Sequence, residues 1–239
     1  MIKIAGFQKN SFIDYPGKIA SVIFLGGCNF ACHYCHNSKL LSAKSNTMDF
    51  AEVLKELKEQ VGFVDGVVIS GGEPTLHPHL KQIIKSIKDL GFLVKLDTNG
   101  TNSEMLKSLD VDFVAMDIKA PPEKYNIITR LPSKIEGGTA CGEVSDCFSS
   151  EIQKSIDFLK SEKTDYMFRL TLSPLLTDDD IKQIGKLVHG AKCFQLQQFV
   201  PNDFSNSHTV VHLPHTLESA KKFELLLSKH CEKVVLRGF

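Results

Sequence analysis

Three of the chain's seven cysteines lie in one short segment, at Cys28, Cys32 and Cys35. Thiolates are soft ligands, and three of them would bind a four-iron cluster while leaving one iron without a protein ligand and open to a substrate. A structural zinc site with His33 or His36 as the fourth ligand is the alternative. Zinc sites usually use two separated ligand pairs, and no second pair with that spacing exists here, so the spacing favours an iron–sulfur cluster over zinc or unreactive thiols.

The other cysteines and histidines do not form a second ligand set. A second cluster would need about four closely spaced thiolates, so Cys141 and Cys147 are predicted to be ordinary loop cysteines. Cys193 and Cys231 are predicted to be small apolar residues of the core. Five further histidines are expected in loops or on the surface, namely His77, His79, His208, His212 and His215.

Segments of two kinds alternate along the chain and would position these side chains. Short apolar and β-branched runs predict buried strands at 19–25, 67–69, 92–96, 113–118, 166–172, 193–199 and 234–236. Apolar residues at helical spacing predict helices near 50–61, 80–90, 103–109, 148–159, 179–188 and 217–227. This alternation predicts a parallel α/β sheet, either a closed or partly closed (β/α) barrel or a doubly wound sheet, and periodicity alone does not choose between them.

The segment from Ala120 to Ser149 lacks this periodicity. A loop of that length in a compact domain is usually functional or disordered. The sequence shows neither an internal repeat nor a second hydrophobic core, so residues 1–239 are predicted to form one domain.

Six successive predicted strands carry polar, glycine-rich or thiol groups, all at or near the strand ends except Arg169, which lies within the fifth strand. The groups are Gly26–Cys28, Ser70–Pro74, Asp97–Gly100, Asp117–Lys119, Arg169 and Gln197-Gln198. Parallel α/β proteins place their sites at the carboxyl ends of the strands, so these groups are expected to share one rim.

The cysteine motif, with Tyr34 just before its last cysteine, resembles the signature of the radical S-adenosylmethionine (SAM) enzymes. Gly71-Gly72-Glu73-Pro74 is similar to the second motif of that family. Within the family, four segments resemble the activases of glycyl radical enzymes, namely 14–17, 35–37, 96–100 and 116–119. The resemblance is greatest to the short activating proteins of anaerobic ribonucleoside-triphosphate reductase, and it includes 195–199 and Arg237-Gly238.

The resemblance implies a partial (β/α)6 barrel of the TIM type with a [4Fe-4S] cluster held by Cys28, Cys32 and Cys35, the residues central to catalysis. It implies SAM contacts from Tyr34, Gly71, Gly72, Glu73, Asp97, Asn99, Lys119, Arg169 and Gln198. Gly71 and Gly72 would let the backbone approach the methionyl end of SAM, and Glu73 would accept a hydrogen bond from its amino group. Lys119 and Arg169 would pair with the SAM carboxylate, although a salt bridge at the rim is the alternative for Lys119.

A monovalent cation is a further implied ligand, because Asp97, Thr98 and Asp117 resemble its oxygen ligands in a formate-lyase activase. Helix capping or a hydrogen bond to the SAM ribose is the alternative for these residues. Asp14 resembles a residue that activases place near the target peptide. The chain has Gln198-Phe199-Val200 where the formate-lyase pattern has a histidine, so that SAM contact does not transfer.

Composition limits the partners. The 28 basic and 28 acidic residues give zero formal net charge, which argues against nucleic acid. No apolar run reaches the roughly 20 residues of a membrane helix, and the first residues do not resemble a signal peptide, so a soluble cytoplasmic protein is expected.

The first hypothesis for the function is an activase that takes a hydrogen atom from a glycine Cα of anaerobic ribonucleotide reductase, with flavodoxin or ferredoxin as reductant. The second is a radical SAM enzyme that acts on another glycyl radical enzyme or on a small molecule. The third is a non-enzymatic binding module stabilised by zinc or a cluster.

Overall fold

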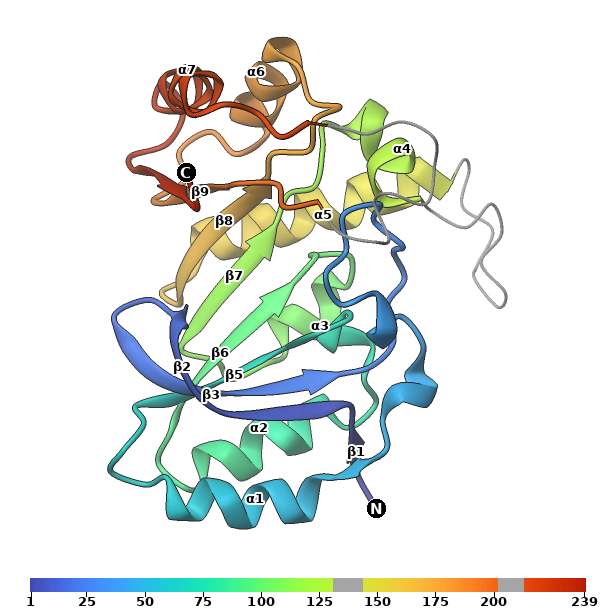
Figure 1. Cartoon of the computed structure of the whole chain (residues 1–239), viewed down its shortest axis with the longest axis vertical. Helices are drawn as coiled ribbons and strands as arrows, with labels where there is room; N and C mark the ends of the chain where they lie inside the picture. The colour runs from blue at the N-terminus through green and yellow to red at the C-terminus, as the bar shows by residue number, and fades with distance from the viewer. Residues whose placement is uncertain (131–143, 202–212) are drawn as a thin grey trace. The chain divides into compact units, whose positions relative to one another are not determined.

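The computed structural model describes residues 1–130, 144–201 and 213–239 (Figure 1). These residues form two compact units. The first unit contains Met1–Asn29, Asn37–Thr98 and Glu104–Ala115. The second contains Phe30–His36, Asn99–Ser103 and Met116–Phe239, as far as its residues are described.

The sheet of the first unit begins with an antiparallel hairpin of β2 (Gly6–Tyr15) and β3 (Lys18–Leu25). Strand β3 pairs in parallel with β5 (Gly66–Gly71), and β5 pairs in parallel with β6 (Leu93–Thr98). Next to β6 in the strand order is β7 (Phe113–Asp117), whose first three residues belong to this unit. A separate short pair joins β1 (Lys3–Ile4) to β4 (Met48–Asp49).

Two amphipathic helices accompany these strands, α1 (Phe50–Glu59) and α2 (Leu80–Lys88) (Figure 1). Helix α2 buries Leu80, Ile83, Ile84 and Ile87, the spacing that gives a helix one apolar face. The short helix α3 (Ser103–Lys107) and three 3-10 turns complete this part, at Ser38–Leu40, Ala43–Ser45 and Pro74–Leu76. A separate apolar cluster lies within the unit, formed by Tyr15, Ala20, Val22 and Val68 with Phe24, Leu93 and Phe113 packed against them.

The sheet of the second unit contains β8 (Asp165–Thr171), β9 (Phe194–Gln197) and β10 (Val234–Arg237), which pair in parallel. The last two residues of β7 also belong to this unit. Its helices are α4 (Tyr125–Thr129), α5 (Val144–Ser161), α6 (Asp178–Leu187) and α7 (Leu217–Leu227), with a 3-10 turn at Pro122–Lys124. Thr177 and Asp180 form a capping box that fixes the start of α6.

The strand order is β2-β3-β5-β6-β7-β8-β9-β10, which rises along the chain without a reversal. A doubly wound sheet reverses its order at a switch point, whereas a (β/α) barrel adds each strand beside the last. Strands β2 and β10 stand at the two ends of this order. The predicted α/β fold of the partial-barrel type is therefore confirmed.

Two local predictions differ from the structure. Strand β2 was not predicted, because half of its residues are exposed and it lacks a clear apolar alternation. Part of the segment predicted to be irregular is helical, since 122–129 forms a 3-10 turn and α4, and α5 begins at Val144. Cys141, His208 and His212 lie outside the described residues, and of Cys147 only its place on α5 is described. None of the described helices is long and apolar enough to cross a membrane.

Candidate functional site

Gly71 and Gly72 pack the end of β5 against the backbone that leads to Cys28, all within the first unit. Gly72 N donates to Leu25 O and Glu73 N donates to Gly27 O, both at 2.8 Å. A Cβ on Gly71 would overlap the backbone of Leu25, and one on Gly72 would overlap the carbonyl of Gly27. The two glycines are thus needed for close contact between backbones, whereas the sequence analysis assigned them to the approach of SAM.

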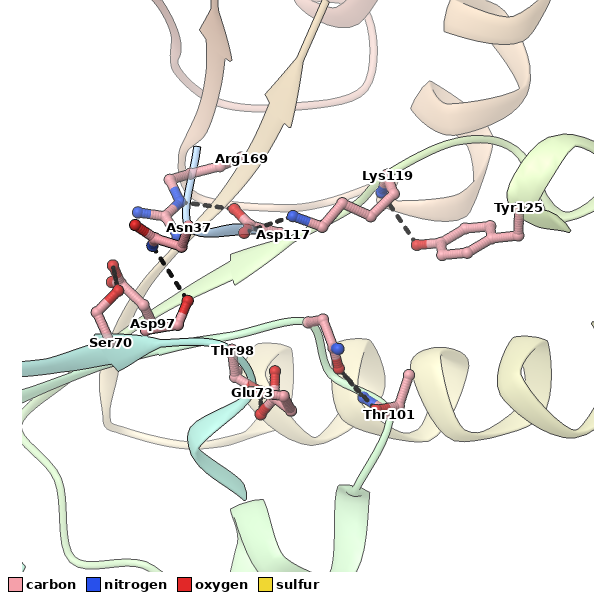
Figure 2. Close-up of polar contacts among 12 residues, drawn as sticks. Asn37, Ser70, Glu73, Asp97, Thr98, Thr101, Asp117, Lys119, Tyr125 and Arg169 are labelled. Carbon is pink, nitrogen blue, oxygen red and sulfur yellow. Dashed lines mark hydrogen bonds and ion pairs between the residues drawn. The ribbon is translucent and has the colours of Figure 1, made fainter. Parts of the chain in front are cut away.

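Glu73 is buried at the start of the 3-10 turn that follows (Figure 2). Its Oε1 accepts hydrogen bonds from Thr75 N at 3.0 Å, Thr75 Oγ1 at 2.5 Å and Thr98 Oγ1 at 2.7 Å. Three donors on one oxygen fix the orientation of this carboxylate. Thr98, predicted as a cation ligand, therefore serves as a hydrogen-bond donor to Glu73.

Asp97 lies at the end of β6, in the same unit. Ser70 Oγ donates to its Oδ2 at 3.1 Å, and the ammonium of Lys95 pairs with its Oδ1. Asn37 Nδ2 donates to Gly71 O at 3.1 Å (Figure 2). Lys95 was not among the residues predicted for the site. The one feature of the sequence that indicates it is a lysine inside an otherwise apolar strand.

Asp117, Lys119 and Arg169 form a charged group in the second unit (Figure 2). Arg169 Nε lies 2.7 Å from Asp117 Oδ1, and Lys119 Nζ lies 2.8 Å from Asp117 Oδ2. Burial alone would raise the pKa of Asp117, but the charges of Arg169 and Lys119 hold it well below its ordinary value. The salt bridge foreseen for Lys119 is thus present, and the group as a whole carries one net positive charge.

The predicted cation site gains no support from these contacts. Asp97 already pairs with Lys95, Thr98 donates to Glu73, and Asp117 pairs with two cationic side chains. Ammonium and guanidinium groups of the chain itself thus lie against both carboxylates.

The part of the cysteine loop that belongs to the second unit, Phe30–His36, is anchored through its backbone and through His33. Ala31 N donates to Thr129 O at 2.8 Å, and Cys35 N donates to Cys32 O at 3.0 Å. The two ring nitrogens of His33 lie 3.4 Å from Ile128 O and 3.2 Å from Ser173 Oγ. Both are therefore engaged, which argues against His33 as the fourth ligand of a zinc site.

All three motif cysteines are thiols in the structure, Cys32 buried and Cys28 and Cys35 partly exposed. Burial raises the pKa of the Cys32 thiol to about 11. Across the described ranges, no three His, Cys, Asp or Glu side chains are arranged to hold a metal ion. Three cysteine thiolates are ligands that suit an iron–sulfur cluster. The assignment of the cluster to these cysteines rests on that chemistry and not on a preformed arrangement of the three side chains.

Tyr34 lies within this loop, between Cys32 and Cys35, with its ring at an edge-on angle to His33 and to Phe199, at centroid distances of 5.0 and 6.5 Å. Lys119 Nζ lies 6.0 Å from the centre of the Tyr34 ring. Burial keeps the pKa of Tyr34 well above its ordinary value, so the phenol stays neutral. Its hydroxyl is buried without a hydrogen-bond partner among the described residues.

Two glutamines at β9 are also incompletely paired. Gln198 Nε2 donates to His215 O at 3.2 Å, while Gln198 Oε1 is buried and has no partner in the described part of the chain. The same holds for Gln195 Nε2. Buried polar atoms are rarely left unpaired, so these atoms, with the Tyr34 hydroxyl, are suited to receive a polar ligand. Asn99, by contrast, accepts bonds from the backbone and hydroxyl of Thr101 and shapes the turn after β6.

Comparison with known proteins identifies the family. Residues 22–188 match the radical SAM superfamily. A protein of Methanocaldococcus jannaschii, provisionally named a glycyl-radical enzyme activating enzyme, is 33% identical over 98% of this chain and 95% of its own length. The pyruvate formate-lyase-activating enzyme of Streptococcus mutans is 28% identical over 87% of this chain and 81% of its own.

Solved structures show the same fold at low sequence identity. TYW1 with a lysine-pyruvate adduct bound matches 88% of this chain and 73% of its own, with a TM-score of 0.59 and 18% identity. Streptococcus suis SuiB bound to the precursor peptide SuiA matches 90% of this chain, with a TM-score of 0.65 and 10% identity. The match covers 48% of the SuiB chain, so this chain spans about half of that protein.

The chain belongs to the radical SAM superfamily and is a radical SAM enzyme, a family that implies a [4Fe-4S] cluster and SAM as cofactors. More narrowly, it falls in the group of glycyl-radical enzyme activating enzymes. Family membership leaves the non-enzymatic binding module without support. The roles predicted for individual site residues stay predictions.

Proposed function

We propose that this chain activates anaerobic ribonucleoside-triphosphate reductase by removing one hydrogen atom from a glycine Cα of that enzyme. Gln195 on β9 and Gln198, which directly follows that strand, carry the choice of target. The segment Gln195–Phe199 resembles the short reductase activases, and it stands where formate-lyase activases have a histidine. The polar atoms of Gln195 and Gln198 that lack partners among the described residues support a ligand-binding role for this segment.

Cys28, Cys32 and Cys35 would hold the cluster, which supplies the electron for reductive cleavage of the SAM sulfonium. The glycine Cα–H bond would break homolytically and its hydrogen atom would go to the adenosyl fragment, so that the products would be 5′-deoxyadenosine, methionine and a glycyl radical. A flavodoxin or a ferredoxin would provide the electron. The glycine that loses the hydrogen atom would lie in a loop of the partner protein and not in a small molecule.

The residues of the chain orient and neutralise SAM. Glu73 is fixed through its Oε1 and would accept a hydrogen bond from the SAM ammonium. The group of Asp117, Lys119 and Arg169 carries a net positive charge, which suits the SAM carboxylate. Tyr34 and Gln198 would present a neutral hydroxyl and an amide oxygen to the bound cofactor.

The test combines two measurements under strict exclusion of oxygen. The chain is reconstituted with iron and sulfide, reduced, and mixed with SAM, and 5′-deoxyadenosine is quantified for wild type and Cys32→Ala. The same mixture is then given purified anaerobic ribonucleotide reductase or pyruvate formate-lyase, and the glycyl radical is measured by electron paramagnetic resonance.

A radical formed only in the reductase supports the proposal. A radical formed only in the lyase would show another target. SAM cleavage with neither radical would favour a different substrate. No cleavage, with stoichiometric zinc in the purified chain, would overturn the enzymatic assignment.

A further inference from the structure

Lys95 is a buried cation that the proposed function does not use. Its side chain is 2% exposed, and it lies in the middle of β6. Its ammonium pairs with Asp97 Oδ1, while Ser70 Oγ occupies Oδ2 at 3.1 Å. All three residues belong to the first unit, so this contact is internal to one compact body.

The surroundings of Lys95 make its charge costly. In the sheet register Lys95 is the partner of Val68, a member of the apolar cluster defined above. Leu93, two residues earlier on the same face of β6, packs against that cluster. A methionine or leucine would fill this volume without desolvating an ammonium, so the charge needs a specific partner to be retained. Among the described contacts, Asp97 provides such a partner.

We propose that the Lys95 ammonium serves as a built-in monovalent cation for Asp97. Carboxylate and hydroxyl oxygens at the ends of neighbouring strands are ligands that suit a bound cation, as the sequence analysis noted. The ammonium of Lys95 supplies that charge from within the chain and holds Asp97 in one orientation. The chain therefore requires no bound potassium, sodium or ammonium ion at this carboxylate. Lys95 is a positioning residue that acts through Asp97.

The test replaces Lys95 with methionine in the full-length chain and measures thermal unfolding in three chloride salts of equal ionic strength: choline, potassium and ammonium. Equal ionic strength keeps general screening constant. Wild type is expected to unfold at the same temperature in all three salts. Lys95→Met should unfold about 6 to 12 °C lower in choline, because Asp97 loses its buried partner. Potassium or ammonium should restore at least half of that loss.

Two further variants make the result specific. Lys95→Met with Asp97→Asn removes both charges, so it should unfold above the single variant and show no response to the cation. Lys85→Met is the matched control, since its ion pair with Asp89 at 2.9 Å is exposed and its loss should shift unfolding by less than about 2 °C.

The proposal is overturned if wild type responds to the cation as strongly as Lys95→Met, or if Lys95→Met is as stable as wild type in choline. Should the single variant not fold, a folded and cation-insensitive double variant supports the proposal, and an unfolded one overturns it. The measurement uses neither SAM nor the cluster. The role proposed for Lys95 can therefore be refuted while the proposed activity stands. Equally, the proposed activity can be refuted while the role of Lys95 is confirmed.

Discussion

Thr98 is the residue whose role changed most between sequence and structure, from a candidate cation ligand to a hydrogen-bond donor for Glu73. Replacing it with valine keeps the shape but removes the donor 2.7 Å from Glu73 Oε1. Under the proposed contact between Glu73 and the SAM ammonium, a less firmly oriented carboxylate should weaken SAM binding by up to about tenfold, because hydrogen bonds to charged groups contribute about 1.5 to 3 kcal/mol. Equilibrium binding of SAM to the reconstituted enzyme measures this effect. Ser108→Ala, which loses an exposed hydroxyl bonded to Met105 O, should bind SAM as wild type does; an equal loss in both variants would contradict the assignment.

At this scale the sequence predicted where the candidate site residues lie along the strands but not how their side chains pair. Parallel strands bring their carboxyl ends together, which is why Glu73, Asp97 and Asp117 could be placed at strand ends from the sequence. The pairing of Asp117 with both Lys119 and Arg169 depends on side-chain geometry that no spacing encodes. Lys95 was missed because lysine in a strand is usually solvated, and only the structure shows its burial.

Among the elements, the loop that follows β5 depends on Gly72. A Cβ added at this position would overlap the backbone carbonyl of Gly27. That carbonyl cannot move without displacing the segment that leads to Cys28. Gly72→Ala should therefore lower the iron bound per chain after reconstitution and weaken the visible absorption of the cluster. Gly91→Ala is the control, because Gly91 has a φ of 86° and nothing within 4 Å of its would-be Cβ. That variant should lose some stability through backbone strain but bind iron normally. Normal iron content in Gly72→Ala would show that the loop can adjust.

Helix α6 depends on the capping box between Thr177 and Asp180. Burial raises the pKa of Asp180, but hydrogen bonds from Lys124 and Thr177 outweigh it and lower the pKa below its ordinary value. When the pKa of a carboxyl is lower in the folded than in the unfolded state, its ionised form stabilises the fold at pH values above the unfolded-state pKa. This stabilisation is lost as the pH falls through the folded-state pKa. Asp180→Asn should thus cost about 1 to 2 kcal/mol at pH 7, and its difference from wild type should shrink below about pH 4.

Urea unfolding of wild type and Asp180→Asn between pH 3 and 7 measures this dependence, within the range where both proteins unfold reversibly. Asp179→Asn is the matched control on the same turn, because Asp179 is largely exposed and its ion pair within the described part of the chain is with Lys182. It should change stability little at any pH. A constant difference between wild type and Asp180→Asn across this range would show that the cap acts through shape and not through charge.

For the whole molecule, the alternation of strands and helices was enough to predict an α/β fold. It did not decide between a (β/α) barrel and a doubly wound sheet. The choice required the strand order, which rises from β2 to β10 without reversal. Hydrophobic periodicity records which face of an element is buried, and it carries no information on which strand lies beside which. The resemblance of the cysteine motif supplied the partial-barrel prediction before the strand order confirmed it.

Cluster loading should stabilise the whole chain. A ligand that binds the folded state and not the unfolded one raises stability by its binding free energy, which is about 4 kcal/mol when its concentration exceeds the dissociation constant a thousandfold. At this chain length such a gain corresponds to a rise in the unfolding temperature of about 8 to 16 °C. Anaerobic thermal unfolding before and after reconstitution measures it. Cys32→Ala removes one of three thiolates and should show little or no rise under the same treatment. If the Cys32→Ala variant were stabilised as much as wild type, iron would be binding elsewhere in the chain, and the ligand assignment of Cys28, Cys32 and Cys35 would be wrong.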